Sequence, residues 1–459
     1  MEASDSTFDE ERKRILSPEN QFENAEWEET KKDGSSLPAA SFNYVNSIVG
    51  SGIIGMAYAL NQAGILMGLI LILGLGVVTD YSLIILIKAS RISGTQSYQG
   101  VMNAAFGKVG YTVLSILQFV YPFIAMVSYN VIVGDTITKV IIYYVGLESG
   151  SIFGRRELII SLTTLLFSLP LSLCDGMAKF AKVSLISLIV TGFVLFSIIF
   201  RLFTLGPFVP QSSDAWVLAK PGITQAVAIA SFAYMCHHST FLLYGSLKQP
   251  TESRWARLTH ASVFTSALIE IFFALFGYAT FTGFVQGDLL ENYCRGDHLM
   301  NAARIMFCLT ILLTAPIECF VARDLIMSTL LERKTNEDGS FTGTNNFLPK
   351  IIVTFSLVIA TCLISFSTDC LSIVLEFNGV FAAIPLAYIL PAICYLRLEP
   401  SPWKSWRKLP ALLMAFFGII MSLSGLVMIF VNWGVNSTCS HGVEMNYCPI
   451  WVNSTRSNS

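Results

Sequence analysis

The first apolar stretch of the chain is interrupted by a glycine-rich run. Gly50, Ser51, Gly52 and Gly55 lie in the middle of FNYVNSIVGSGIIGMAYALNQAG. Glycine weakens a helix interior by about 1 kcal/mol relative to alanine, so the run predicts a break in the helix. At such a break, the amides of the following half-helix can bind a carboxylate, and the freed carbonyls of the preceding half can coordinate a small cation. Alternatively, the glycines only allow helices to pack closely.

A second polar interruption lies in the sixth apolar stretch, at Cys236, His237, His238, Ser239 and Thr240. Ionisable side chains are costly inside a membrane helix, and they usually face a cavity or a partner. His237 and His238 are adjacent and therefore point to different faces of a helix, and no further His or Cys set has metal-ligand spacing. We therefore expect a functional role for this stretch, and no metal site beyond one for a small cation. The sequence has no Ser/His/Asp set, nucleotide-binding loop or HExxH motif, which argues against an enzyme.

Five acidic residues fall within or near apolar runs: Asp80, Asp135, Glu270, Glu318 and Glu376. Glu270 is the deepest in its run. A buried carboxyl group favours its neutral form, and this is how a proton could be coupled to a membrane process. The alternative is that each carboxylate pairs with a Lys, an Arg or the backbone. Asp135 and Lys139, four residues apart, could form such a pair.

The composition requires that these residues be positioned by membrane-spanning helices. The chain has 459 residues, of which 53% are hydrophobic and 13% are charged, whereas about 25% of the residues of a soluble domain are charged. The apolar runs do not alternate as barrel strands would, so helices satisfy their backbone groups best. We expect an all-α polytopic protein with about eleven spans, at residues 39–60, 65–88, 111–144, 157–174, 179–203, 223–245, 259–284, 299–322, 349–368, 370–396 and 409–432.

The distribution of Lys and Arg predicts the orientation. These residues concentrate in alternate short loops if the N-terminus is cytosolic, and an odd number of spans then places the C-terminus outside. Residues 1–37 are rich in charged residues and Ser, so we expect a disordered cytosolic head and no cleavable signal peptide. Residues 433–459 form the expected extracellular tail. Asn436 and Asn453 begin Asn-Ser-Thr patterns there and are candidate glycosylation sites.

Three cysteines are candidates for disulfide bonds because they lie on the predicted outer side. Cys439 and Cys448 are in the tail, and Cys294 follows the seventh span. Outer thiols usually pair in an oxidising compartment. A Cys439–Cys448 bond is the first expectation, but Cys294 could take either partner. The remaining cysteines are expected to be small packing residues: Cys174, Cys236, Cys308, Cys319, Cys362, Cys370 and Cys394.

Interruptions in the first and sixth spans are what a five-plus-five inverted repeat predicts. Several segments are also similar to one known family. Four segments resemble the sodium-coupled neutral amino acid transporters (solute carrier family 38). They are the first-span sequence quoted above, Cys236-His237 in the sixth span, LTAPIECFVARD in the eighth span and FNGVFAAIPLAYILPAICYLRL in the tenth span. The resemblance covers roughly residues 38–432.

This resemblance implies a LeuT-like core of ten helices with an eleventh added, and symport of sodium with a small neutral amino acid. The oxygen-rich sodium site it implies suits an alkali cation. By position, the resemblance implies a sodium site formed by Asn46, the Val49 carbonyl, Thr310 and Thr314. It implies a substrate site formed by Gly50, Ser51 and Gly52 at the carboxylate, and by Phe232, Cys236 and His237 at the side chain.

The chain also departs from the family pattern. Many relatives have a proline soon after the Cys-His pair, where this chain has His238-Ser239-Thr240, and better-known members have a large glycosylated loop where this chain has only 204–222. Substrate range is therefore open. Two alternatives remain on the same fold: a proton-coupled amino acid transporter, and an amino acid sensor that signals through residues 1–37. The resemblance favours the plasma membrane over the lysosome, and we infer no obligate protein partner and no nucleic acid.

Overall fold

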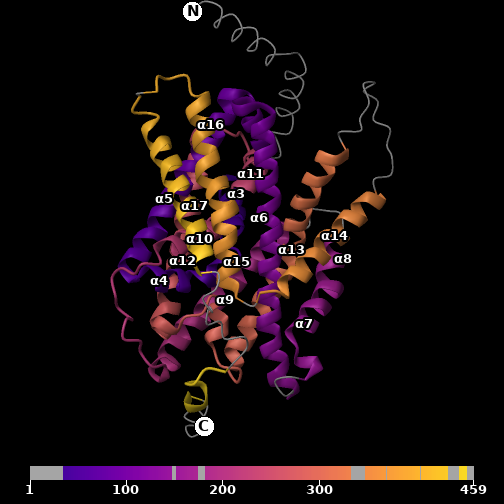
Figure 1. The fold of residues 1–459 in the computed structure, drawn as a ribbon, viewed down its shortest axis with the longest axis vertical. Helices are drawn as coiled ribbons and strands as arrows, with labels where there is room; N and C mark the ends of the chain where they lie inside the picture. Colours follow the sequence, from indigo (N-terminus) through magenta and orange to yellow (C-terminus); the bar gives the residue numbers. More distant parts are fainter. Residues whose placement is uncertain are drawn as a thin grey trace, which may run out of the picture.

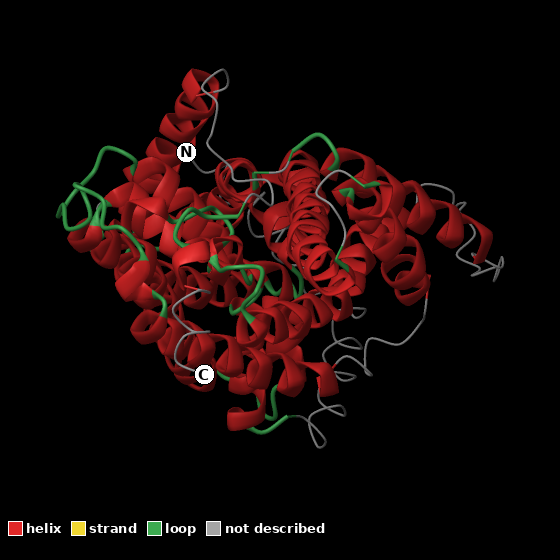
Figure 2. Cartoon of the chain, turned by 90° about the horizontal axis from the view of Figure 1, so that it is seen from below, coloured by secondary structure: helices red, strands yellow, loops and turns green. Residues whose placement is uncertain are grey.

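The computed structural model describes residues 35–146, 151–173, 181–331, 347–368, 370–403, 405–432 and 444–451. These residues are almost entirely helical, as Figure 2 shows. Within these ranges, the extended pairing is limited to one isolated bridge, between Ser35 and Leu247. That bridge joins the segment before the first span to the end of the sixth.

The helices agree with the predicted all-α membrane architecture. Ten helices in the described ranges are long and apolar enough to cross a membrane. The first span adds an eleventh, but it is divided into two pieces that are too short to meet that criterion. In chain order the spans are α3 (Leu37–Ile48) with α4 (Met56–Ala63), α5 (Ile65–Ser93), α6 (Tyr98–Val145), α7 (Arg156–Thr163) with α8 (Leu169–Leu173), α9 (Ala181–Thr204), α10 (Ile223–Ala233) with α11 (Thr240–Ser246), α12 (Glu252–Phe281), α13 (His298–Leu331), α14 (Phe347–Ser365), α15 (Leu371–Asn378) with α16 (Leu390–Leu398), and α17 (Leu409–Asn432).

The third span begins earlier than its apolar run. Helix α6 starts at Tyr98 rather than near residue 111, and it kinks at Gly107, where φ is 61°. A residue other than glycine is strained at such a positive φ, so Gly107 separates a short amphipathic helix from the spanning part. Hydropathy alone could not find residues 98–106, because that segment mixes buried and exposed positions.

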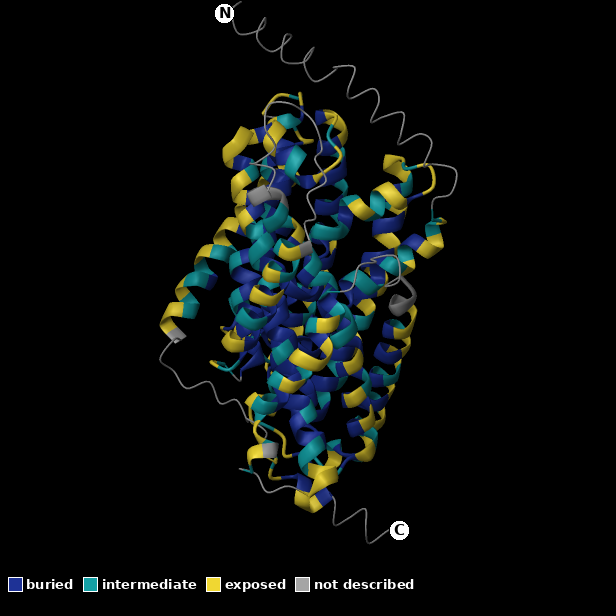
Figure 3. Cartoon of the chain, turned by 90° about the vertical axis from the view of Figure 1, so that its right-hand side faces the viewer, coloured by how far each residue is buried: buried dark blue, intermediate teal, exposed yellow. Residues whose placement is uncertain are grey.

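The spans form a bundle around a few enclosed helices. Figure 1 shows α13, α14, α7 and α8 on one side of the long helix α6, and α5, α10, α12 and α17 on the other. The sixth and tenth spans are the most enclosed, with 72% and 78% of their apolar windows buried, against 22% for α17. Figure 3 likewise shows burial concentrated in the middle of the bundle. The sixth and tenth spans are therefore placed to line a central site, whereas α17 faces the lipid.

Residues 444–451 lie at the lower edge of the bundle in Figure 1. Cys448 forms a disulfide with Cys294 in the loop between α12 and α13. The Tyr447 hydroxyl donates to the Asn292 carbonyl at 2.6 Å, and the Arg201 guanidinium lies 5.0 Å from the Trp451 ring centre. These contacts fix residues 444–451 to that loop and to α9.

The disulfide bonds correct two expectations about the cysteines. Cys448 pairs with Cys294, so the first expectation, a Cys439–Cys448 bond, is wrong, and the alternative that Cys294 takes Cys448 as its partner is the one found. Cys370, which was expected to be a packing residue, is also disulfide-bonded. The connectivity depends on how the loop after α12 approaches the tail, which residue spacing does not reveal. Cys174, Cys439, Asn436 and Asn453 lie outside the described residues, as does almost all of the predicted head.

Candidate functional site

The first helix breaks at the predicted place. Helix α3 ends at Ile48, and the backbone leaves helical geometry at Val49 (φ −78°, ψ 76°) and Gly50 (φ −105°, ψ −146°). A 3₁₀ turn over Ser51–Gly55 follows, and α4 then begins at Met56. Gly50 is exposed although it lies in the middle of the bundle. A β-carbon built on it would meet no atom within 4 Å, so the break borders open space.

The sixth span breaks opposite the first. Helix α10 ends at Ala233, Cys236 has φ −138° and ψ 6°, and α11 begins at Thr240 after a short turn. A β-carbon built on Gly52 would lie 2.7 Å from Ala233 Cα, so the two interrupted spans approach backbone to backbone. Non-helical backbone at membrane depth is tolerated where it is enclosed by protein or lines a wet cavity. The two breaks together therefore form one polar centre.

Side-chain hydrogen bonds tie the two breaks together on one side. The Tyr44 and Thr240 hydroxyl oxygens are 3.0 Å apart, and those of Ser47 and Ser239 are also 3.0 Å apart. The Cys236 thiol donates to the Tyr44 hydroxyl at 3.4 Å. These bonds therefore connect helix α3 to the second half of the sixth span.

The predicted sodium ligands are divided between two helices. Asn46 lies on α3, and its Oδ1 is buried without a hydrogen-bond partner among the described residues. On α13, the Thr314 hydroxyl donates to the Thr310 carbonyl at 3.1 Å, and the Thr310 hydroxyl donates to Phe307 O at 2.7 Å. Both hydroxyls keep lone pairs that a cation can use. No hydrogen bond among the described residues joins Asn46 or Val49 to these threonines.

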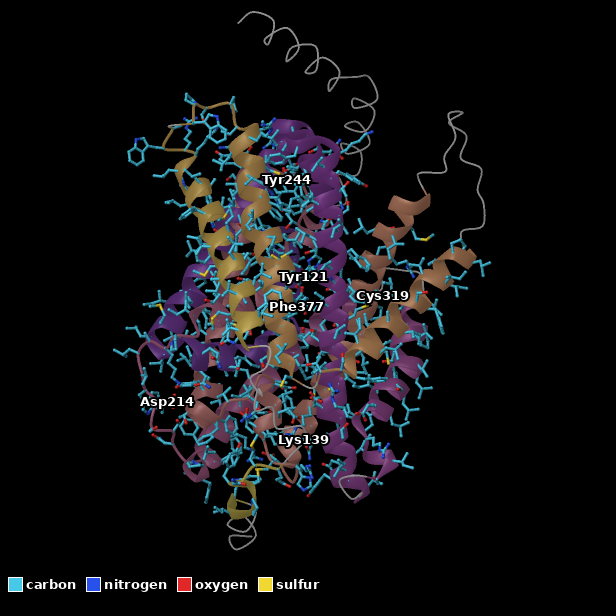
Figure 4. All side chains as sticks on the ribbon, in the orientation of Figure 1. Tyr121, Lys139, Asp214, Tyr244, Cys319 and Phe377 are labelled. Atoms are coloured by element: carbon cyan, nitrogen blue, oxygen red, sulfur yellow. A yellow bond between two sulfur atoms is a disulfide. The ribbon has the colours of Figure 1, made fainter. Side chains whose placement is uncertain are left out.

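Of the residues predicted to contact the substrate side chain, Phe232 lies in an aromatic cluster. Phe232 is buried, and its ring centre lies 5.7 Å from that of Tyr121 on α6. Tyr121 also lies 5.5 Å from the ring of His238, which is only partly buried. Figure 4 shows Tyr121 at mid-height in the bundle, near Phe377. Phe232, Tyr121 and His238 thus form an aromatic wall at the level of the two breaks.

Cys236 and His237 are placed differently from the aromatic wall. Both are fully buried. His237 Nε2 lies 3.1 Å from the Ser82 hydroxyl of α5. The sequence pattern missed Tyr121. The resemblance implied that His237 contacts the substrate side chain, whereas the structure places His238 against Tyr121 and His237 against Ser82. The one available signal was Pro122 in the middle of α6, which marks an irregular position in a span.

Glu318 adds a carboxyl group to this centre. It lies on α13, one turn after Thr314, and its Oε2 has no hydrogen-bond partner in the described part of the chain. It interacts electrostatically with Tyr121 and Tyr129 of α6, and Tyr129 in turn neighbours Ser51. The centre therefore presents backbone amides, a carboxyl group with one unpartnered oxygen, and aromatic surface. This combination can hold a small zwitterion with an apolar side chain.

The other carboxylates of the spans mostly have partners. Asp135 and Lys139 do not pair with each other, because Asp135 binds Arg156 and Lys139 binds Glu291 at 2.8 Å. Gln225 donates to Glu376 at 3.3 Å, and Asp80 lies 2.6 Å from His260. Figure 4 shows Lys139 near the lower edge of the bundle, far from Tyr121. These pairs are structural contacts between helices rather than parts of the centre.

Comparison with known sequences gives a consistent result. The family described as "Transmembrane amino acid transporter protein" matches residues 33–433. The chain is 46% identical over 418 residues to "Putative sodium-coupled neutral amino acid transporter 11" of Danio rerio, covering 91% of each chain. It is 45% identical over 389 residues to the Homo sapiens protein of that name, covering 85% of this chain and 93% of the other. "Vacuolar amino acid transporter 2" of Saccharomyces cerevisiae is 30% identical over 404 residues, covering 85% of this chain and 82% of the other.

Solved structures share the fold at low sequence identity. MhsT in complex with L-phenylalanine is similar with a TM-score of 0.54 and 13% identity, covering 85% of this chain and 97% of that one. The manganese transporter of Eremococcus coleocola is similar with a TM-score of 0.52 and 12% identity, covering 92% of each chain. The expected LeuT-like fold is therefore confirmed. The matched family and the named relatives are transporters rather than enzymes.

Proposed function

Because this multi-pass membrane protein belongs to the transmembrane amino acid transporter family, we propose that it carries a neutral amino acid across the membrane together with sodium. The observation that carries the proposal is the pair of facing helix breaks, with open space at Gly50 and an unpaired Asn46 Oδ1 beside it. Alternating access would expose this centre to one side of the membrane and then to the other.

The substrate end of the proposal rests on the residues around Gly50. The amides of the turn over Ser51–Gly55 would receive the carboxylate, helped by the positive end of α4. Glu318, across the centre, would attract the ammonium group. The wall of Phe232, Tyr121 and His238 would contact an apolar or small polar side chain. Because the zwitterion's own charges meet opposite charges, a neutral amino acid fits better than an acidic one.

The sodium end of the proposal rests on oxygen atoms that lack full partners. Asn46 Oδ1 is buried and accepts no hydrogen bond from the described residues, and leaving such an acceptor unpaired costs about 1–3 kcal/mol. A sodium ion would satisfy it, together with the Val49 carbonyl and the Thr310 and Thr314 hydroxyls. For these oxygen atoms to act as one site, α13 must approach α3. Such an approach would couple sodium binding to a change in the conformation of the carrier.

We further propose that the upper edge in Figure 1 is cytosolic and the lower edge extracellular, with the plasma membrane as the location. The bias of Lys and Arg in the loops supports this orientation. The Cys294–Cys448 bond also supports it, because disulfides persist on the oxidising side of a membrane. Glycosylation of Asn436 and Asn453 would follow from the same orientation.

The test is uptake of a radiolabelled panel of neutral, acidic and basic amino acids by proteoliposomes containing the purified full chain. We expect uptake of one or more neutral amino acids that falls when external sodium is replaced by choline. Uptake that is equal in choline and in sodium would contradict the proposed coupling to sodium. Binding of an amino acid without flux would favour the sensor alternative, and deletion of residues 1–34 should then abolish signalling but not binding.

A further inference from the structure

Glu270 differs from every other carboxylate of the spans. It lies in the middle of α12, and its exposed fraction is 0%. Neither carboxyl oxygen has a partner in full hydrogen-bond geometry among the described residues, and the Tyr234 hydroxyl is its polar neighbour. Asp80, Asp135 and Glu376 each have a partner, and Glu318 is only partly buried. A buried carboxyl group without a partner calls for a specific explanation.

The groups around Glu270 are polar but carry no compensating positive charge. Ser266, four residues earlier on α12, and Tyr234 each have a buried hydroxyl without a partner in the described ranges. The Tyr234 hydroxyl lies between α5 and α12, because a β-carbon built on Gly76 would be 3.4 Å from it and 3.7 Å from Ala267 Cβ. The polar groups of Ser266, Tyr234 and Glu270 are thus gathered at one place, with the Tyr234 hydroxyl next to the Glu270 carboxyl group.

The titratable groups that face Glu270 come from two neighbouring segments. Tyr234 and Cys236 belong to the connection between α10 and α11, and Tyr388 belongs to the π-helical turn before α16. The Tyr388 hydroxyl is already within 3.1 Å of the Thr79 hydroxyl of α5. Asp80 and His260, also on helices α5 and α12, pair with each other. No Lys, Arg or His of the described residues, on α3, α4, α5 or α9 or elsewhere, compensates the charge of Glu270.

An ionised Glu270 would be strongly disfavoured in this conformation. Removing a carboxylate from water without a partner costs several kcal/mol. The O–H group of the neutral carboxylic acid can instead donate a hydrogen bond to a neighbouring hydroxyl oxygen.

We propose that Glu270 is a proton-binding site of the carrier, occupied in the conformation described here and emptied when the connection between α10 and α11 moves. An O–H bond forms on one carboxyl oxygen with a proton delivered by water, and the same proton returns to water when the rearranged connection admits it. Tyr234 and Cys236 of that connection adjoin the break that faces Gly52. Substrate binding and proton release would therefore both involve the connection between α10 and α11. This inference rests on the proposed transport function, but it assigns a different ligand to a different residue.

The first experiment detects the proton directly and does not require transport. Infrared difference spectra of the purified full chain, recorded during a pH titration, should contain the carbonyl stretching band of a protonated carboxylic acid. We expect Glu270→Gln to lower the intensity of that band by the contribution of one carboxyl group. Glu252→Gln, on the same helix but exposed, should leave it unchanged. A band of wild-type intensity in Glu270→Gln would overturn the proposal.

The second experiment measures coupling in proteoliposomes loaded with a pH-sensitive dye. For wild type we expect proton movement during amino acid uptake and a rate that changes roughly threefold or more between about pH 6 and 8. Glu270→Gln should lose both properties, whereas Glu270→Asp, which keeps the acid, should retain the pH dependence. Wild-type proton movement and pH profile in Glu270→Gln would contradict the proposal. If wild type shows no uptake but has an infrared band assigned to Glu270, the proposed transport function is rejected and the proton-binding site is not.

Discussion

Gly52 of the first span touches Ala233 at the end of α10 so closely that a β-carbon on residue 52 would lie 2.7 Å from Ala233 Cα and 2.8 Å from Ala233 Cβ. Contacts this short do not occur in relaxed structures, and both atoms belong to rigid parts of the chain. The two interrupted spans therefore meet at a position where only glycine fits.

The first prediction is that Gly52→Ala separates the two breaks. Overpacking of this kind costs about 1–3 kcal/mol, so we expect a lower melting temperature in detergent and strongly reduced uptake. Gly74→Ala is the matched control, because a β-carbon there meets no atom within 4 Å. Equal melting temperatures for the two variants would show that the close approach does not exist.

The second prediction concerns Asn46 and sodium. Removing its Oδ1 in Asn46→Ala should raise the sodium concentration for half-maximal uptake by roughly tenfold, which corresponds to about 1–2 kcal/mol for one lost oxygen ligand. Surface expression should change little. Asn103→Ala, at an exposed position before the α6 kink, should behave as wild type. Sodium activation curves that overlay for Asn46→Ala and wild type would exclude Asn46 from the site.

The third prediction tests the connectivity of the outer cysteines. Cys294→Ser and Cys448→Ser should each lower stability by about 2–4 kcal/mol, because the bond closes a long loop between α12 and the tail. The double variant should cost no more than either single variant, since both remove the same bond. Cys362→Ala, at a free cysteine, is the control. Peptide mapping under non-reducing conditions that finds Cys439 joined to Cys448 would contradict the structure.

The fourth prediction is a pH effect at the lower edge of the bundle. Burial, and then the nearby Glu291 carboxylate, raise the pKa of Asp288 from 3.8 to about 7. The folded state therefore holds a proton that the unfolded state has already released, and stability should fall as the pH rises from about 4 through about 7. Asp288→Asn removes this loss. We expect it to be more stable than wild type at about pH 8 by roughly 1–3 kcal/mol, and equal at about pH 4.

A matched control for this effect is available on the same edge. Lys220 and Ser212 hydrogen bonds lower the pKa of Asp214 to about 2, so Asp214 is ionised over the whole range of the experiment. Asp214→Asn should therefore show a pH-independent difference from wild type in melting temperature. A pH profile for Asp288→Asn that parallels wild type would mean that Asp288 does not titrate in this range.

The sequence by itself determined the features that depend on local chemistry. The apolar runs predicted the spans because each spanning helix satisfies its own backbone groups. The break near Gly50 and the polar turn after Ala233 followed from residues that weaken a helix at that very place. The start of α6 was missed because the helix at 98–106 is not apolar enough to be recognised by hydropathy.

Only the tertiary structure decided which distant groups meet. It paired Cys448 with Cys294 and Lys139 with Glu291, and it placed His238 rather than His237 against Tyr121. It also left Glu270 without a partner, although Glu270 and Asp135 look alike in their apolar runs. Each of these outcomes depends on how helices far apart in the chain rotate and approach, and the spacing of residues along one helix carries no information about the helix across from it.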